Sequence, residues 1–362
     1  MFKINNKRLS KGSLGAGLAA AAIMLAAIFF APGSARATES AAAELEYSVV
    51  QPLADRSVLL GITRAGDRLV AVGERGHVLL SDNNGESWRQ IVVPTVVTLT
   101  SVYFFDDKIG WAVGHDVTIL HTKDGGETWE LQKQSIPDET PLFDIWFRTP
   151  TSGIAFGAYG WVLRTEDGGK TWEQGTIQEQ KEVERWSSDD DRDILDPGGL
   201  DMSLELDDLH LNKVIKTESG DLFVAAEQGF LYRSSDNGQN WDKVTTPYNG
   251  SFWMVMDAGD GAIVSAGMRG NIFRSADGGV TWDKVATDTI ASFQNGHKLL
   301  DGRLVVVGLT GKVLISSDGG KTFELTGRAD RLGIADFAEL ESGVIVLVGE
   351  GGLKRHLLGQ DN

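Results

Sequence analysis

Ser275-Ala-Asp-Gly-Gly-Val-Thr-Trp282 is one of six copies of an eight-residue phrase, and the spacing of these copies determines the fold. The other five copies are Ser81–Trp88, Thr122–Trp129, Thr165–Trp172, Ser234–Trp241 and Ser316–Phe323. Their closing aromatic residues are separated by 41, 43, 69, 41 and 41 residues. A period near 41 residues indicates one supersecondary unit that is stacked many times.

The phrase predicts a tight turn between two strands. Each copy has a glycine where such a turn needs positive φ: Gly85, Gly126, Gly169, Gly238, Gly279 and Gly320. Five copies have an acid that can accept backbone N–H bonds inside the turn, and the first copy has Asn83: Asp124, Asp167, Asp236, Asp277 and Asp318. Five copies close on an indole that begins the next strand and packs: Trp88, Trp129, Trp172, Trp241 and Trp282. We therefore expect a structural role for these residues.

Short apolar runs precede every turn. In the second copy they are residues 101–105, 110–114 and 117–122, each rich in β-branched and aromatic residues and bounded by Gly, Asp or Asn. Such runs are typical of strands. Together with the strand that the closing Trp begins, each unit contains four strands. Four-stranded units with a period of 40 to 45 residues are typical of propeller blades.

The number of units predicts an all-β, seven-bladed β-propeller of four-stranded antiparallel blades over residues 45–356. Six units carry the phrase, and a seventh, from Gly333 to His356, supplies only three strands. Tyr47–Pro52 resembles Trp88–Pro94, the strand that follows the first phrase. We therefore expect the N-terminal strand to complete the last blade and to close the ring, which hides sheet edges.

The N-terminus has the order of a secretory signal. Basic residues lie within the first 13 positions, an apolar run spans residues 14–30, and small residues follow at Ala35 and Ala37. We expect a signal peptide over residues 1–37, cleavage after Ala37 and a linker over residues 38–44. An uncleaved membrane anchor is the alternative, although the apolar run is near the short limit for a span. The prediction places the protein in the periplasm or outside the cell.

Composition excludes several classes of partner. The formal net charge is −17, and the chain after residue 37 has 51 acidic and 29 basic residues. This balance argues against nucleic acid and against electrostatic attachment to anionic lipid. The chain has no cysteine, so neither a disulfide nor a cysteine-linked lipid is possible. The six histidines have no metal-binding spacing, and we expect no metal or cofactor.

One region breaks the period. An acidic insertion over about residues 176–208 separates the third and fourth blades, with twelve acidic and three basic residues from Glu179 to Asp208. A solvated loop, a docking arm for a partner and a cation site are the three interpretations. A C-terminal tail is expected over residues 357–362.

The phrase resembles the Asp-box, or BNR repeat, which also occurs in sialidases. A sialidase begins with an Arg-Ile-Pro segment that is missing here, and Tyr47 and Tyr232 fall on predicted outer strands, away from a central pocket. We therefore expect no catalytic residues and no enzyme. The alternative is a glycan-binding module or a sialidase-like glycoside hydrolase that uses the channel mouth lined by the first strands. A concave mouth with paired acids and exposed aromatic residues would favour that alternative.

Three arginines occupy one position in consecutive units. Arg164, Arg233 and Arg274 each precede the Ser or Thr of the phrase, whereas Leu80 and Ile315 stand there in other copies. Rotation about the ring places the three side chains on the end that carries the phrase. An Arg fork suits a carboxylate, so they form a candidate partner-binding patch. The alternative is internal: each Arg pairs with an acid of a neighbouring blade or covers apolar surface with its stem.

The units resemble the photosystem II stability/assembly factor propellers. Gly270–Trp282 fits the signature Gly-x-x-x-Arg-Ser-x-Asp-Gly-Gly-x-Thr-Trp throughout, and Gly160–Trp172 fits it with Thr for Ser. The resemblance implies a non-enzymatic ring in the periplasm, or in the thylakoid lumen of a photosynthetic host. We expect a monomer. It also implies a partner that is a membrane protein or an envelope complex. It implies that Arg164, Arg233 and Arg274 match the family's arginine patch.

Overall fold

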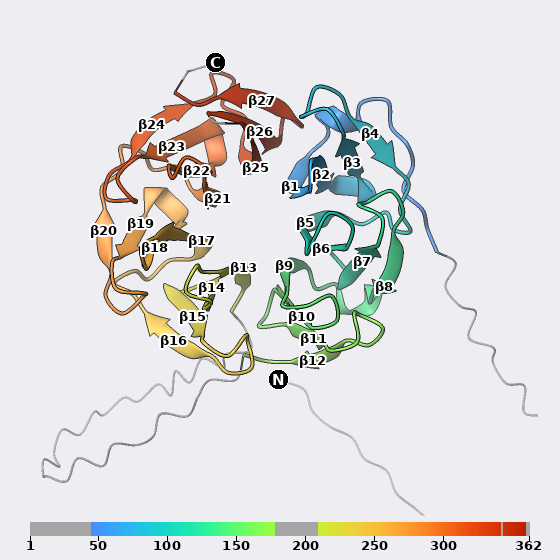
Figure 1. Cartoon of the computed structure of the whole chain (residues 1–362), viewed down its shortest axis with the longest axis horizontal. Helices are drawn as coiled ribbons and strands as arrows, with labels where there is room; N and C mark the ends of the chain where they lie inside the picture. Colours follow the sequence, from blue (N-terminus) through green and yellow to red (C-terminus); the bar gives the residue numbers. More distant parts are fainter. Residues whose placement is uncertain (1–44, 178–208, 342, 360–362) are drawn as a thin grey trace, which may run out of the picture. The chain divides into compact units, whose positions relative to one another are not determined.

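The computed structural model describes residues 45–177, 209–341 and 343–359. Within these ranges the strands form seven antiparallel sheets arranged around a central opening (Figure 1). The prediction of an all-β, seven-bladed propeller is confirmed. The expected signal peptide, the linker and nearly all of the acidic insertion lie outside the described residues. No helix in the described ranges is long and apolar enough to cross a membrane.

The blades follow one another along the chain. Blades 1 to 3 consist of β1 (Leu59–Ala65), β2 (Arg68–Gly73), β3 (Val78–Ser81), β4 (Arg89–Ile91); β5 (Leu99–Phe104), β6 (Gly110–Gly114), β7 (Thr118–Thr122), β8 (Glu130–Lys133); β9 (Leu142–Phe147), β10 (Gly153–Gly157), β11 (Val162–Thr165) and β12 (Glu173–Gly175). Blades 4 and 5 consist of β13 (Leu211–Lys216), β14 (Leu222–Ala226), β15 (Phe230–Ser234), β16 (Asp242–Thr245); β17 (Phe252–Gly259), β18 (Ala262–Gly267), β19 (Ile272–Ser275) and β20 (Asp283–Val285). Blades 6 and 7 consist of β21 (Phe293–Lys298), β22 (Leu304–Gly308), β23 (Lys312–Ser316), β24 (Glu324–Gly327); β25 (Ile334–Glu341), β26 (Val344–Gly349) and β27 (Lys354–Leu357).

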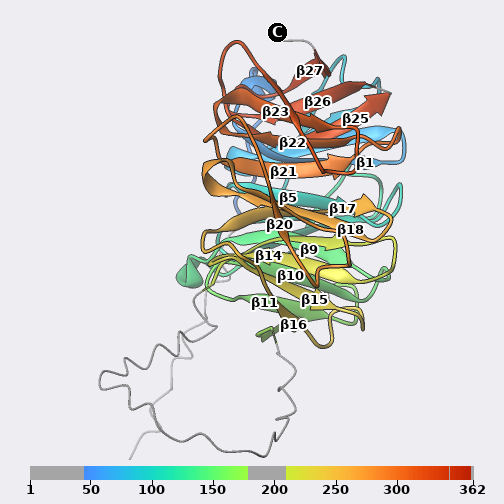
Figure 2. The same cartoon turned by 90° about the vertical axis from the view of Figure 1, so that its left-hand side faces the viewer.

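Each blade is a meander, and the meander defines two ends of the channel. The first strand lines the centre, and the others follow outward in sequence order (Figures 1 and 2). The inner strands begin at one end, here called the entrance end. Because successive strands are antiparallel, the eight-residue turns between the third and fourth strands lie at the opposite end, here called the box end. The acidic insertion lies between β12 and β13. Because β12 ends and β13 begins at the entrance end, the insertion is attached to the ring at that end.

The hydrophobic core lies between the blades. The structure has seven clusters of buried apolar side chains, and each cluster draws residues from two neighbouring blades. One cluster joins the last blade to the first, with Val346 and Val348 packed near Leu59, Leu69 and Ala71. A blade has two apolar faces, because alternate side chains point to opposite sides of its sheet. A single blade therefore cannot bury its core alone, and the stack is needed for stability.

The predicted role of the N-terminal strand is wrong. Within the described residues the last sheet has only β25, β26 and β27, and residues 47–52 form no strand with it. They lie beside blade 1 instead, where the Ser48 N–H donates to the Val93 carbonyl at 2.9 Å. The side chain of Gln90 donates to the carbonyl of Val49 at 3.0 Å and accepts the N–H of Gln51 at 2.8 Å. The amide of Gln90 thus satisfies backbone groups of this segment on the outside of the first blade.

Contacts between inner strands close the ring. The Ile62 N–H in β1 donates to the carboxylate of Asp336 in β25 at 3.1 Å. The Arg64 guanidinium donates to the carbonyls of Glu339 and Leu340 at 2.9 and 3.2 Å. These polar bonds and the apolar cluster between the last and first blades hold the two ends of the chain together.

Candidate functional site

Side-chain bonds close each turn at the box end. In the sixth copy the Ser316 hydroxyl donates to the Asp318 carboxylate at 2.8 Å and accepts the Gly320 N–H at 2.9 Å. Asp318 also accepts the N–H and the hydroxyl of Thr322 at 3.0 and 2.7 Å. Gly320 has φ 81°. The same carboxylate bonds recur in four other copies: Asp124, Asp167, Asp236 and Asp277. These carboxylates are therefore occupied inside their own turns.

The bonds within the turns lower the pKa values of their acids. The N–H and hydroxyl of Thr171 hold the pKa of Asp167 at about 2. The hydroxyl and N–H of Thr281 do the same for Asp277, whose pKa is also about 2. A carboxylate that accepts several N–H and O–H bonds is stabilised in its charged form. The turns therefore keep their negative charge across the neutral range.

Two of the predicted arginines connect their blades to the next turn. Arg164 in β11 donates to the carbonyl of Gly238 at 2.6 Å, and Arg274 in β19 donates to the carbonyl of Gly319 at 2.7 Å. Gln132 and Arg68 make the same kind of bond to Gly168 and Gly125, at 2.8 and 2.9 Å. Burial lowers the pKa of Arg164. These side chains join neighbouring blades through backbone carbonyls, whereas the internal alternative named acids as their partners.

The third arginine is bound within its own blade. Arg233 in β15 donates twice to one oxygen of Asp221, at 3.0 and 2.6 Å, and its guanidinium carbon lies 5.9 Å from the centre of the Phe223 ring. An acid also faces each predicted arginine across the next strand. The cross-strand pairs are Arg164–Glu173, Arg233–Asp242 and Arg274–Asp283. The three arginines therefore occupy equivalent places at the box end, and each has internal partners.

The grooves beside these arginines differ in charge. Arg164 lines a groove of about 240 Å³ between blades 3 and 4, together with Trp146, Arg148 and Glu166. Arg233 lines a groove of about 370 Å³ between blades 4 and 5, where the ionised neighbours are acidic: Glu218, Asp221, Asp257, Asp260 and Asp277. An anionic segment fits the first groove better than the second. The box end is therefore not a uniformly basic surface.

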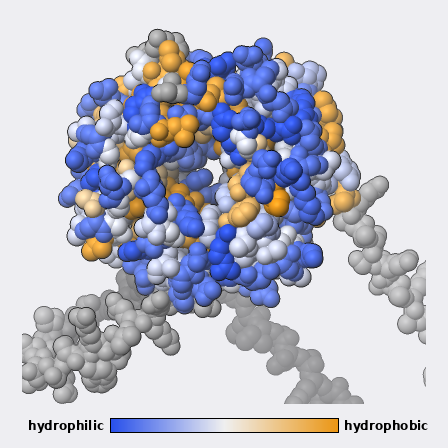
Figure 3. All heavy atoms as spheres, in the orientation of Figure 1, coloured by the Kyte–Doolittle hydropathy of each residue, from blue (hydrophilic) through white to orange (hydrophobic). Residues whose placement is uncertain are grey.

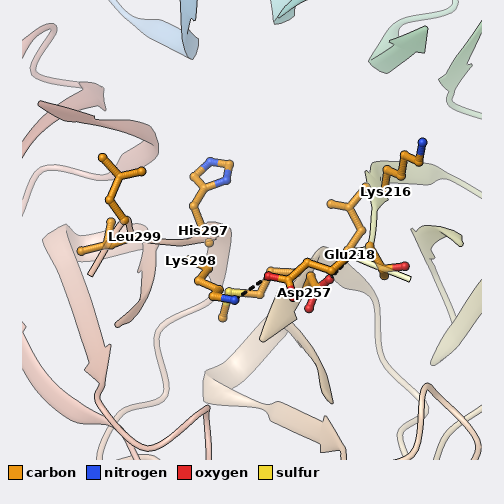
Figure 4. Close-up of a pocket in the computed structure, with 11 residues that line it drawn as sticks. Lys216, Glu218, Asp257, His297, Lys298 and Leu299 are labelled. Carbon is orange, nitrogen blue, oxygen red and sulfur yellow. Dashed lines mark hydrogen bonds and ion pairs between the residues drawn. The ribbon is translucent and has the colours of Figure 1, made fainter. Parts of the chain in front are cut away.

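A wider cavity lies at the box end of the inner strands. It has a volume of about 500 Å³ and is lined by residues of β13, β17 and β21 and of the turns that follow β13 and β21. Figure 4 shows Lys298 reaching across to Glu218, and their charged groups lie 2.7 Å apart. The bond from Glu218 raises the pKa of Lys298. Leu300 is 91% exposed at its rim. This cavity joins charged groups and an apolar side chain on one open surface.

Polar side chains form a belt near the entrance end of the channel, which the sequence analysis missed. They occupy the third position of five inner strands: Ser101, Asp144, Lys213, Asn295 and Asp336. Asp144 accepts the Ser101 hydroxyl at 2.7 Å and the Val214 N–H at 3.0 Å, and the Lys213 ammonium lies 3.3 Å away. Asp336 accepts the Asn295 amide N–H at 2.7 Å. Aligning the units by strand position reveals polar residues at one place in otherwise apolar runs.

The belt surrounds the mouth of the channel. All seven blades line a cavity of about 430 Å³ there, with Lys213, Trp253 and Asp336 among the lining residues. The central opening of the ring is also visible in Figure 3, where the face turned to the viewer is largely hydrophilic. Burial acts to lower the pKa of Lys213, but the carboxylates of Asp144 and Asp336 outweigh it and raise the pKa. The mouth is therefore concave and contains a charged ammonium group.

Metal-binding chemistry has no support in the part of the chain that the structure describes. No group of three or more His, Asp or Glu side chains there is arranged to hold a metal ion. Of the two tyrosines assigned to outer strands, Tyr232 lies in β15 and is buried, whereas Tyr47 is 55% exposed outside the sheets. Neither tyrosine lines the channel mouth.

Comparisons with known proteins point to photosynthetic assembly factors. A family model described as photosynthesis system II assembly factor YCF48 matches residues 80–142. The photosystem II assembly protein Ycf48 of Thermosynechococcus vestitus is 44% identical over 43 residues, which are 12% of this chain and 12% of that protein. The photosystem II stability/assembly factor HCF136, chloroplastic, of Cyanidioschyzon merolae is 36% identical over 81 residues, or 21% of this chain and 18% of that protein. The matched parts thus span less than one fifth of either relative.

Solved structures extend the likeness to nearly the whole ring. The structure of YCF48 bound to D1 peptide covers 87% of this chain and 97% of its own, with a TM-score of 0.61 and 16% identity. YCF48 from Cyanidioschyzon merolae covers 86% and 98%, with a TM-score of 0.62 and 17% identity. At such identity the likeness shows the fold alone. The matching units and the shared fold together support the resemblance of this chain to the propeller family of photosystem II assembly factors.

Proposed function

We propose that this protein is a non-catalytic propeller that binds a membrane protein or an envelope complex and assists its assembly. The observation that carries the proposal is the match of residues 80–142 to the assembly-factor model. The structure of YCF48 bound to D1 peptide adds a precedent for binding a membrane-protein segment on this fold. A rigid ring is suited to such binding, because it presents grooves between blades without large rearrangement.

The proposed location is outside the cytoplasm. A signal over residues 1–37 directs the chain to the periplasm or the exterior, or to the thylakoid lumen in a photosynthetic host. There the ring meets the exposed segments of membrane proteins. The net negative charge of the chain disfavours attachment to anionic lipid. This favours binding to a membrane protein over binding to the bilayer itself.

The proposed contact surface is the box end between blades 3 and 5. Arg164 lies with Arg148 and Trp146 in the groove between blades 3 and 4, where a carboxylate and an apolar group of a client both find a partner. Arg148 lies 3.7 Å from Glu166, a weak surface pair that a client carboxylate competes for. Arg233 and Arg274 contribute only some of their guanidinium N–H groups, because others already donate to Asp221 and to the Gly319 carbonyl.

Affinity purification with cross-linking tests the proposal. The full chain is compared in its own envelope fraction with the triple variant Arg164→Gln, Arg233→Gln, Arg274→Gln. A matched control changes three exposed lysines, two in the eight-residue turns and one in β20: Lys170→Gln, Lys321→Gln and Lys284→Gln. Both variants lose three positive charges, so a general charge effect would appear in both. Thermal unfolding verifies that each variant is folded.

The outcomes separate the surfaces. Capture of one membrane protein by the native chain and the lysine variant, but not by the folded arginine variant, supports the proposal and the arginine surface. Equal capture by all three forms supports the function but removes the arginines from it and directs attention to the acidic insertion. Capture of no envelope protein by any form overturns the proposed function.

A further inference from the structure

The channel mouth at the entrance end is a second candidate binding site, on the face opposite the predicted arginines. Its cavity of about 430 Å³ lies within the usual range for small-ligand pockets. Five inner strands contribute both their second and their third residues, whereas β9 and β17 contribute only their second residues, the aromatic Phe143 and Trp253. Because all seven blades build it, the cavity is held rigid by the whole ring.

The cavity has hydrogen-bond donors that the fold does not use up. The Nε2 of Gln294 is buried and has no hydrogen-bond partner among the described residues. A buried donor without an acceptor is costly, and a turn of the Gln294 amide toward the cavity would let a ligand oxygen accept its bond. The Lys213 ammonium carries three donors, and Asp144, 3.3 Å away, occupies one direction. Ligand oxygens therefore have at least two kinds of donor to meet.

Acceptors and aromatic faces line the same cavity. Asn212 donates its amide N–H to the carbonyl of Phe252 at 2.7 Å, which leaves its amide oxygen as an acceptor. Glu227 supplies a carboxylate, one oxygen of which accepts the backbone N–H of His210 at 3.2 Å and the other the hydroxyl of Ser251 at 3.5 Å. Trp253 is half-buried, so part of its ring faces the cavity. Aromatic faces pack against the C–H faces of sugar rings, while amides and carboxylates bind their hydroxyl groups.

The charges at the mouth select against ions. Lys213 is positive, whereas Asp336 and Glu227 are negative, which leaves a small negative balance among the lining residues when the histidines are neutral. This balance disfavours an anion. A cation is disfavoured as well, because the Lys213 ammonium already lies beside Asp144. A neutral ligand remains, and hydroxyl groups suit this site because its lining offers both donors, such as Lys213, and acceptors, such as the Asn212 amide oxygen.

The geometry points to binding of a neutral oligosaccharide segment in the channel mouth. Catalysis is not part of this inference, since the acids beneath the mouth are committed to the fold. Asp336 accepts bonds from Ile62, Asn295 and Phe337, and Asp144 accepts bonds from Ser101 and Val214. A general acid or base needs a free oxygen directed at the substrate. The site is therefore a binding site that is separate from the proposed client surface.

Titration calorimetry with the full chain tests the inference. The probes are cello-, chito- and malto-oligosaccharides of two to four sugars. We expect one series to bind with one site per chain. Trp253→Ala and Gln294→Met should each weaken that binding about tenfold or more. Gln294→Met removes an unpaired donor at similar volume, so it is expected to fold. Tyr47→Ala, which removes an exposed aromatic ring outside the cavity, should leave the affinity unchanged.

Three results would overturn the inference. They are no binding of any probe by the folded chain, binding that survives both cavity variants, and equal loss in Tyr47→Ala. A neutral peptide of six residues is titrated in parallel. Binding of the peptide and of no saccharide, lost in Trp253→Ala, would assign the cavity to polypeptide and reject the glycan. Because the arginine variants leave this end intact, failure here is distinguishable from failure of the proposed function.

Discussion

The carboxylate of Asp336 in the last blade accepts the backbone N–H of Ile62 in the first blade at 3.1 Å, across 274 positions of sequence. Asp144 makes the equivalent bond to Val214 at 3.0 Å between blades 3 and 4. Both acids stand third in their inner strands, and both accept the N–H that follows the third residue of the next blade. One acid therefore bonds two neighbouring blades at each of these interfaces, and at Asp336 the bond also closes the ring.

Loss of this closing acid should destabilise the ring. In Asp336→Ala the Ile62 and Phe337 N–H groups lose their acceptor, and the Asn295 amide loses its partner. Orphaned buried donors predict a loss of about 2–4 kcal/mol in the free energy of unfolding. Urea denaturation measures it. Asp107→Ala on an exposed turn should change the same quantity by less than about 0.5 kcal/mol. Equal effects in the two variants would contradict the closing role.

Acid should destabilise the box turns. The pKa of Asp318 is about 2 in the folded chain, chiefly because it accepts the Thr322 N–H, whereas an aspartate without such bonds has a pKa of 3.8. A folded pKa below the unfolded value means that the stabilisation is complete above about pH 4 and is lost as the pH falls toward 2. Thermal unfolding between pH 7 and pH 2 should show this loss.

The matched variant for the acid transition is Asp277→Asn together with Asp318→Asn. An amide keeps an acceptor oxygen in each turn but does not titrate, so the double variant should lose less stability between pH 4 and pH 2 than the native chain. Superimposable pH profiles for the two proteins would show that these turns do not cause the transition.

Arg164 should contribute more to stability than an exposed cation does. Its bond to the Gly238 carbonyl joins blades 3 and 4, so Arg164→Gln should lower the free energy of unfolding by about 1 kcal/mol. Lys170→Gln removes the same charge at an exposed position in the adjacent turn, so it should hardly change the free energy of unfolding. Chemical denaturation of both variants measures the difference. If Arg164→Gln leaves the free energy of unfolding unchanged, the inter-blade bond contributes little to stability and the side chain can bind a partner instead.

Burial predicts different effects for the closing indoles. Trp241 is fully buried and donates to the Gly238 carbonyl at 3.1 Å, whereas Trp88 is only partly buried. Trp241→Ala should cost about 3–5 kcal/mol through cavity formation. Trp88→Ala should cost clearly less, because solvent fills part of the space. Urea denaturation of the two variants provides the comparison, and a larger effect at Trp88 would contradict it.

The turn chemistry and the number of blades were predictable because they are local. The glycine, the acid and the closing indole of each phrase meet within eight residues, so their spacing alone indicates the turn. The period near 41 residues then indicates a repeated four-stranded unit, since strands of this length with short turns have few ways to pack. Gly320 and Asp318, for example, have the backbone angle and the bonds that their places in the phrase imply.

The tertiary structure alone decided which groups meet across blades. Residues 47–52 resemble a fourth strand, yet they lie against the first blade, because the Gln90 side chain there bonds to their backbone groups. The partners of Arg164 and the belt around Asp144 likewise depend on the angle between neighbouring sheets and the reach of side chains across it. The sequence by itself determined the repeated unit and its turns, whose interactions are short in range. The closure of the ring and the two candidate surfaces depend on contacts between residues far apart in the chain, which no local pattern specifies.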